Sequence, residues 1–220
     1  MCGRYSLHAN PEVVALLFGL SQVPAYAPRY NIAPTANILV VREGIERRNE
    51  AAMLRWGLVP RWAKDPAMGA RMNNARSETA FEKPSFRQPW RERRCLIPAS
   101  GFYEWKDEGG KRQPYYIHPR AGELFAFAGL WDQWRDLQTC AVLTTEANAP
   151  MAEVHERMPV ILAPGEYGAW LHGSDAERRA LMRPCPADAI AIHRVSRAVN
   201  RAANEDPSLI EPEPSEDPAG

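Results

Sequence analysis

Two apolar stretches, LFAFAGLW at residues 124–131 and TCAVLTT at residues 139–145, decide the fold class of this chain. Aromatic, β-branched and small side chains dominate both runs, which is typical of buried strands. Shorter runs of the same kind cover residues 38–42, 51–56, 95–98, 115–118 and 189–195. We therefore expect many strands joined by short turns.

Helical patterns are few and short. Asn10 and Pro11 predict the start of a helix over residues 12–18, and Gly19 predicts its end. Further short helices are expected over residues 75–82, 151–155, 164–171 and 175–182. Because no internal stretch resembles a linker, the 220 residues are expected to form a single α+β domain with a mostly antiparallel β core and several short helices.

The net charge of zero averages two unlike parts of the chain. Residues 204–220 hold six acidic residues and no basic one, and this Pro-rich segment is expected to be a disordered tail after a folded domain of residues 1–203. Without the tail, 27 basic residues stand against 21 acidic ones. Residues 55–94 form a local basic stretch, which suits phosphate contacts but also an ordinary solvated surface.

Several classes of protein are disfavoured by what the sequence lacks. No apolar run resembles a signal peptide or a membrane span, so we expect a cytoplasmic protein with no membrane contact. The four cysteines, Cys2, Cys95, Cys140 and Cys185, form no CxxC pair, so we expect no metal site and no cofactor. Cys95 and Cys140 lie in strand-like runs and are expected to be buried thiols.

Cys2 differs from the other cysteines because it directly follows Met1. Loss of Met1 would give Cys2 a free α-amine beside its thiol, with ordinary pKa values of about 8 and about 8.5. Such an aminothiol condenses with an aldehyde to an imine, and the sulfur then closes a five-membered thiazolidine ring. A cysteine at this position can also be coincidental, so the other segments of the chain must show whether Cys2 has a function.

Three further segments set polar residues among small or apolar neighbours: MNNARSET at 72–79, PASGFYEW at 98–105 and VHERMPVIL at 154–162. Glu104 lies between two aromatic residues, where exclusion of water suits proton transfer, although an alternating strand would turn it to solvent. His155 is either a structural histidine or a proton-transfer group.

The segments together resemble the SRAP family, the SOS response-associated peptidases, also called abasic-site processing proteins. The resemblance covers residues 1–200 in order. Seven motifs carry it: MCGRY at 1–5, RYNIAP at 29–34, WGLVPRW at 56–62, NARSET at 74–79, GFYEW at 101–105, HERMP at 155–159 and VSRAVN at 195–200.

The resemblance implies a barrel-like sheet and a covalent crosslink to abasic sites in single-stranded DNA, with weak lyase activity and self-removal of Met1 as side activities. It implies that Cys2 forms the crosslink, that Asn74 holds the N-terminal residue and the opened sugar, that Glu104 acts as acid and base, and that His155 helps to open the sugar ring. On this basis the protein would act in the DNA damage response, associated with the nucleoid.

The resemblance also assigns DNA contacts. It implies that Arg4 and Arg76 hold backbone phosphates and that Trp62 stacks as a wedge against bases beside the lesion. Some family members carry two adjacent tryptophans at the wedge, where this chain has Arg61 and Trp62. The acidic tail also departs from the family pattern.

Other functions stay open at this point. Class II glutamine amidotransferases also begin Met-Cys-Gly and use Cys2 as a nucleophile, so a glutamine amidohydrolase would release ammonia from glutamine. A non-catalytic single-strand binder would use the basic stretch with Trp56, Trp62 and Trp90, and its binding would not depend on Cys2. A protease acting on other proteins is a further alternative.

Overall fold

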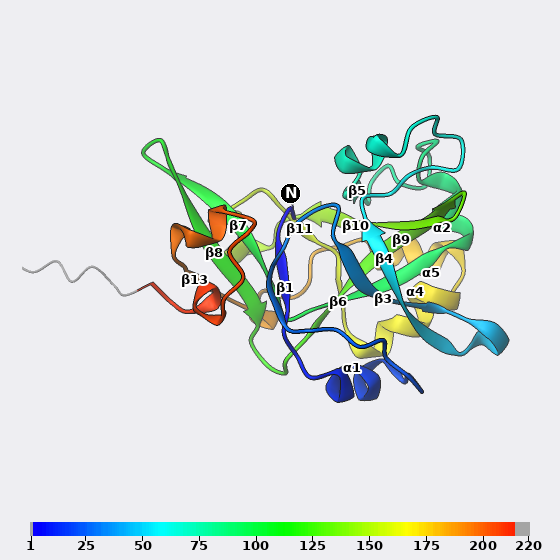
Figure 1. Cartoon of the computed structure of the whole chain (residues 1–220), viewed down its shortest axis with the longest axis horizontal. Coiled ribbons are helices and arrows are strands. Elements are labelled where there is room, and N and C mark those ends of the chain that lie inside the picture. Colours follow the sequence, from blue (N-terminus) through cyan, green and yellow to red (C-terminus); the bar gives the residue numbers. More distant parts are fainter. Residues whose placement is uncertain (1, 214–220) are drawn as a thin grey trace, which may run out of the picture.

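Five strands close into a barrel at the centre of the computed structural model, which describes residues 2–213 (Figure 1). The barrel strands are β3 (Asn37–Glu43), β4 (Asn49–Trp56), β6 (Arg94–Ala99), β9 (Phe125–Trp134) and β10 (Leu137–Glu146). They pair in the order β10-β4-β3-β6-β9, and pairing of β9 with β10 closes the ring. Only the β4–β10 pairing within this ring is parallel.

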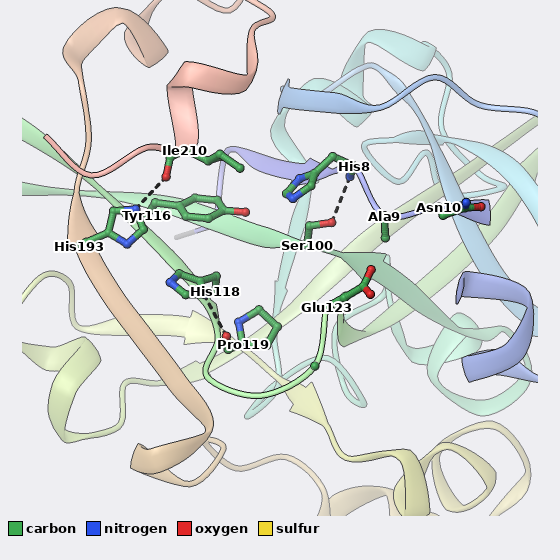
Figure 2. A pocket seen from close by; sticks show the side chains of 11 residues that line it. His8, Ala9, Asn10, Ser100, Tyr116, His118, Pro119, Glu123, His193 and Ile210 are labelled. Atoms are coloured by element: carbon green, nitrogen blue, oxygen red, sulfur yellow. Dashed lines mark hydrogen bonds between the residues drawn. The ribbon is translucent and has the colours of Figure 1, made fainter. Parts of the chain in front are cut away.

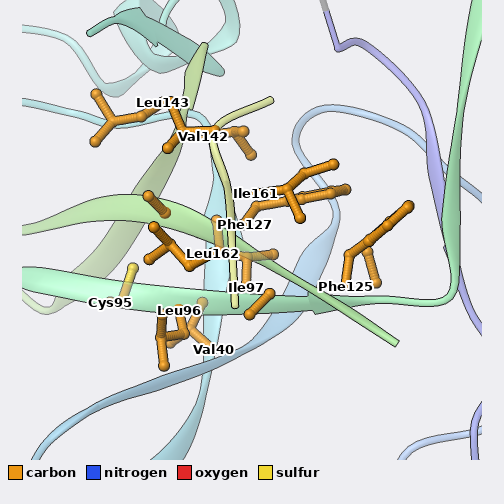
Figure 3. Close-up of a cluster of buried hydrophobic side chains, with 14 of the residues drawn as sticks. Val40, Cys95, Leu96, Ile97, Phe125, Phe127, Val142, Leu143, Ile161 and Leu162 are labelled. Carbon is orange, nitrogen blue, oxygen red and sulfur yellow. The ribbon is translucent and has the colours of Figure 1, made fainter. Parts of the chain in front are cut away.

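The apolar runs at residues 124–131 and 139–145 form strands, as predicted. These strands, β9 and β10, are neighbours in the barrel. Residues 125–130 and 139–145 are buried without a break, which explains why their sequences are continuously apolar. Ile97 of β6 pairs with Phe127 of β9, and both lie in the main hydrophobic cluster, part of which Figure 3 shows. The expected α+β class with a barrel-like, mostly antiparallel core is confirmed.

A second, five-stranded antiparallel sheet carries the amino terminus. Its order is β13 (Ile190–Arg194), β8 (Lys111–Pro119), β7 (Gly101–Glu108), β1 (Tyr5–Leu7) and β2 (Arg29–Ile32). Strand β6 of the barrel ends at Ala99 and β7 begins at Gly101, so the chain passes directly from one sheet to the other. Three short strands extend the barrel sheet: β5 (Asn74–Arg76), β11 (Arg157–Pro159) and β12 (Ile161–Leu162).

In the described part of the chain, five short α-helices surround the sheets: α1 (Pro11–Phe18), α2 (Arg87–Glu92), α3 (Ala149–Ala152), α4 (Tyr167–His172) and α5 (Asp175–Ala180). The predicted start of α1 is confirmed, because the Asn10 side chain accepts a hydrogen bond from the Glu12 N–H at 3.0 Å. Its end is also confirmed, since Gly19 adopts the left-handed conformation. No helix within residues 2–213 is long and apolar enough to cross a bilayer.

The helix expected over residues 75–82 is wrong. Asn74–Arg76 forms strand β5, which pairs with Val142–Thr144 of β10, and turns follow it. The residues of this segment favour a helix locally, but the open edge of β10 supplies hydrogen-bond partners for an extended chain. Tertiary pairing therefore overrides local propensity here.

The tail expected from Asn204 also differs from the structure as far as it is described. Residues 196–213 form a strap over the second sheet, with Leu209 buried against Tyr103 and Tyr116. The Glu205 carboxylate accepts hydrogen bonds from the N–H groups of Tyr30 and Asn31 on edge strand β2. Burial of Leu209 and the hydrogen bonds that the Glu205 carboxylate accepts from β2 thus anchor residues 204–213 despite their acidic composition. Residues 214–220 lie outside the described residues.

Gly101 is required where β1, β7 and β8 pack closely. A β-carbon at this position would lie 2.3 Å from the Tyr116 ring and 2.7 Å from the Ile117 carbonyl oxygen. We expect Gly101→Ala to lower the free energy of unfolding by about 1–3 kcal/mol through overpacking, measured by urea denaturation.

Gly168→Ala is the matched control. A β-carbon there meets no atom within 4 Å, and Gly168 lies in α4. The control should be neutral, or stabilising by up to about 1 kcal/mol through helix propensity. Equal stabilities for the two variants would contradict the packing argument.

Candidate functional site

Cys2 lies buried between the two sheets, as part of the main hydrophobic cluster. Its carbonyl oxygen accepts a hydrogen bond from Asn74 Nδ2 at 2.7 Å and a longer one from Asn73 Nδ2 at 3.4 Å. Because β5 pairs Asn74 with Val142 of β10, this amide is fixed to the barrel edge. Asn74 therefore fastens the backbone of Cys2 in place.

Glu104 reaches the same site from the second sheet. Tyr5 pairs with Phe102, and the Tyr103 N–H donates to the Arg4 carbonyl at 2.9 Å, so the same register places Gly3 opposite Glu104. The Glu104 side chain is 2% exposed. The structure therefore brings Glu104, Asn74 and Cys2 together from segments about 30 to 100 residues apart in the sequence.

The surroundings of the Cys2 thiol disfavour its thiolate form. Burial, and secondly the neighbouring Glu104 carboxylate, raise the pKa of this thiol well above its usual value, although the Arg4 backbone N–H partly opposes the shift. A buried thiolate beside a carboxylate is unfavourable until a positive charge develops nearby. The site thus suits chemistry in which Cys2 first binds an electrophile that becomes cationic.

His155 lies between α3 and β11, with a fixed ring orientation. The Arg157 N–H donates to His155 Nδ1 at 2.9 Å, and the same ring nitrogen lies 3.3 Å from the Arg157 carbonyl oxygen. Strand β10 joins this segment to β5, because Thr144 pairs with Pro159 on one side and with Arg76 on the other.

An ion pair connects the same two segments. Arg157 donates to both carboxylate oxygens of Glu78, at 2.6 and 2.9 Å, and its guanidinium lowers the pKa of Glu78. Sequence reasoning missed this pair, although Glu78 lies in NARSET and Arg157 in HERMP. The pair ties together the segments that carry Asn74 and His155.

Arg4 lies on the other face of β7 from Glu104. Its guanidinium sits 6.0 Å from the Trp105 ring, and residues 104 and 105 of a strand point to opposite faces. Arg4 Nη1 donates to Asn31 Oδ1 at 2.7 Å and to the Val199 carbonyl at 2.9 Å. The half-buried Arg4 thus has partners within its own chain, and its phosphate contact stays a prediction.

Trp62 and Arg76 are both exposed. Trp62, 57% exposed, stands on the loop between β4 and β5, and Arg76 ends β5. The exposed Trp62 is one of the few large apolar side chains turned to solvent, which suits a contact with a flat partner.

The loop that carries Trp62 is held on both sides of the ring. Arg61 pairs with Asp132 at 3.1 Å, and Trp134 Nε1 donates to the Ala63 carbonyl at 2.7 Å. Asp132 also pairs with Arg93 at 3.2 Å and is itself 3% exposed. Sequence reasoning missed Asp132, because nothing in strand β9 marks it as the partner of a loop about 70 residues away.

Metal ligands are not grouped at this site. Within residues 2–213, no three side chains of the His, Cys, Asp and Glu types are arranged so that they could bind one metal ion together. The four cysteines are all buried and free. The arrangement of Cys2, Asn74 and Glu104 supports nucleophilic and acid–base chemistry by side chains.

Sequence comparison connects the site to known proteins. A family described as SOS response associated peptidase (SRAP) matches residues 1–202. The abasic site processing protein YoqW of Bacillus subtilis is 42% identical over 96% of this chain and 99% of its own length. The abasic site processing protein HMCES of Gallus gallus is 33% identical over 85% of this chain and 67% of its own length.

Solved structures share the same architecture. A crystal structure of a Bacteroides thetaiotaomicron protein has a TM-score of 0.87 and 27% identity, covering 96% of this chain and all of that one. A Bordetella bronchiseptica protein has a TM-score of 0.80 and 30% identity, covering 89% of this chain and all of that one.

Asp132→Ala should destabilise the protein by about 1.5–3 kcal/mol, because it removes the buried carboxylate that pairs with both Arg93 and Arg61 and leaves Arg93 only its pair with the exposed Glu92. Urea denaturation measures this change. The exposed Glu82→Ala serves as the control and should change stability by less than about 0.5 kcal/mol. A neutral Asp132→Ala would refute the anchoring role.

Proposed function

We propose that this chain, which belongs to the SOS response associated peptidase (SRAP) family, captures abasic sites in single-stranded DNA as a covalent crosslink. The observation that carries the proposal is the contact of Cys2 with Asn74 beside the buried Glu104. The names of the relatives supply the substrate class, and the site supplies groups suited to an aldehyde.

The first step is imine formation. Loss of Met1 exposes the α-amine of Cys2, and the abasic deoxyribose opens to its aldehyde with proton transfer by His155 and Glu104. The amine nitrogen bonds to the aldehyde carbon, and water leaves. Asn74 holds the Cys2 carbonyl, so the adjoining amine keeps one orientation as the new bond forms.

The second step closes the ring. The protonated imine is a cation, and the buried Glu104 carboxylate stabilises it in a site of low dielectric. Glu104 then accepts the thiol proton, and the sulfur bonds to the former aldehyde carbon. The electron pair of the C=N bond returns to the nitrogen, which becomes neutral. This sequence explains why a thiol with a raised pKa is useful: it stays protonated until the cation forms beside it.

Two side activities follow from the same groups. The imine that precedes ring closure also favours β-elimination at the sugar, so weak strand-cleaving lyase activity accompanies capture. Removal of Met1 would use Cys2 as the nucleophile of a self-cleavage, which accounts for the peptidase in the family description.

DNA would be held by exposed groups around the site. Arg76 is exposed at the end of β5, two residues after Asn74, and would bind a backbone phosphate. Trp62 offers a stacking surface for an unpaired base. Arg4 differs from these two residues because it is half-buried, and its positive charge lies next to Trp105 on the other face of β7.

The test mixes the purified protein, with loss of Met1 confirmed by mass spectrometry, with single-stranded DNA that bears one abasic site. A denaturing gel should show a shifted band for the wild type and none for Cys2→Ala or for an intact oligonucleotide. Cys2→Ser keeps the amine but lacks the thiol, so its band should appear only after borohydride reduction of the imine. Absence of a wild-type band would overturn the proposal, and ammonia release from glutamine would then favour an amidohydrolase.

Glu104→Gln should slow crosslinking by about 10²- to 10⁴-fold, because the amide neither accepts the thiol proton nor balances the imine charge. Single-turnover gel assays measure the rate. Glu108→Gln lies on the same strand β7 and should retain the wild-type rate. Equal rates for both variants would remove Glu104 from the mechanism.

Trp62→Ala should weaken non-covalent binding of single-stranded DNA by about 5- to 140-fold, the equivalent of one lost base stack. Fluorescence anisotropy in a Cys2→Ala background separates this binding from crosslinking. The matched control is Ile45→Ala, whose side chain is 87% exposed on the β3–β4 turn. An unchanged affinity in the Trp62 variant would exclude a stacking role.

A further inference from the structure

A cavity lies beneath the strap, on the face of the second sheet that carries the Tyr116 side chain. Its volume is ≈ 390 Å³, and three histidines line it, His8, His118 and His193, together with the Glu123 side chain (Figure 2). None of these residues takes part in the proposed capture of abasic sites. The hydrogen bonds of these imidazoles determine which ring nitrogens carry a proton.

Backbone carbonyls determine the tautomers of two of these rings. A carbonyl oxygen only accepts, so His118 Nδ1 donates to the Pro119 oxygen at 2.9 Å. By the same argument, His193 Nε2 donates to the Ile210 oxygen at 2.8 Å. In the neutral rings, the lone pairs therefore lie on His118 Nε2 and His193 Nδ1.

The two lone pairs face one another. His193 pairs with Tyr116 across β13 and β8, and His118 follows two residues later on the same face of β8. The ring centroids are 5.3 Å apart, and in Figure 2 the two nitrogens that make no bond to a carbonyl turn toward each other.

Burial shifts the pKa values of titratable groups around the cavity. It lowers the pKa of His193, although the bond to the Ile210 oxygen partly opposes this shift. Burial likewise lowers the pKa of His8, while Glu123 opposes that shift. The remaining titratable group, Tyr116, is hydrogen bonded to Ser6 at 2.8 Å and has its pKa raised by burial. Glu123 is thus the group that brings a negative charge to the cavity.

We propose that His118 and His193 bind a divalent transition-metal cation of the Zn²⁺, Ni²⁺ and Cu²⁺ class. Neutral imidazole nitrogens are the ligands these ions prefer, at about 2.0–2.1 Å for Zn²⁺. Metal-binding histidines characteristically donate their other N–H to a backbone carbonyl, as both rings do here. Because the site has two protein ligands, water completes the coordination. The cation would link His118 on β8 to His193 on β13, whose ring donates a hydrogen bond to the strap residue Ile210.

The experiment titrates the untagged full-length protein with Zn²⁺ and with Ni²⁺ by isothermal calorimetry and follows the thermal transition. His118→Asn keeps an amide nitrogen for the Pro119 carbonyl, and His193→Gln keeps one for the Ile210 carbonyl, so each removes only the ligand nitrogen. The control is His172→Gln, whose ring lies 3.2 Å from Glu43 outside this cavity.

The wild type and His172→Gln should bind one equivalent and melt at a higher temperature with the metal. Each cavity variant should weaken binding by at least about 10-fold and lose the thermal shift, yet melt like the wild type without metal and crosslink abasic DNA at the wild-type rate. No binding by the wild type, or binding that survives in both cavity variants, would overturn the proposal. Crosslinking is scored separately, so its failure leaves the metal result readable.

Discussion

The pairing of β1 between β2 and β7 is the constraint on which the rest of the structure depends. Chain termini usually fray because few contacts hold them, yet Tyr5 pairs with Ile32 on one side and Phe102 on the other. All three residues of β1 are buried. The strand anchors the amino-terminal segment inside the molecule, and Asn74 then holds Cys2 against the barrel edge. The proposed reaction through the α-amine of Cys2 needs such an anchor, because after loss of Met1 this amine would be the terminal group of the chain.

The side chains of strand β7 alternate between two faces of the second sheet, and the residues on the two faces have different surroundings. Glu104 points toward Cys2 and the space between the sheets, whereas Tyr103 and Trp105 point to the face covered by the strap. Asn31 holds this covered face together: it accepts from Arg4 and donates to carbonyl oxygens of the strap. The histidine cavity opens on the same side, so the two proposed sites share a sheet without sharing a face.

Long apolar runs and capping residues were readable from the sequence, because their signals are local. The strands around 124–131 and 139–145 and the helix that begins after Asn10 are present as predicted. Strands β1 and β5 escaped prediction because three residues are too few for an alternating pattern. Residues 204–213 look disordered by composition, yet Leu209 fills a gap over Tyr103 and Tyr116 that exists only after the second sheet has formed.

The sequence predicted the candidate residues of the site: a cysteine after Met1, an asparagine, a glutamate and a histidine, each within a short motif. Their proximity was not predicted, because Cys2 precedes β1, Asn74 begins β5 and Glu104 lies in β7. Only the pairings of β1 with β7 and of β5 with β10 bring these residues together. The Arg157–Glu78 pair and the two facing histidine lone pairs were equally hidden. Residue types and local order follow from short-range chemistry, whereas ion pairs, burial and tautomers follow from long-range packing, which no single segment encodes.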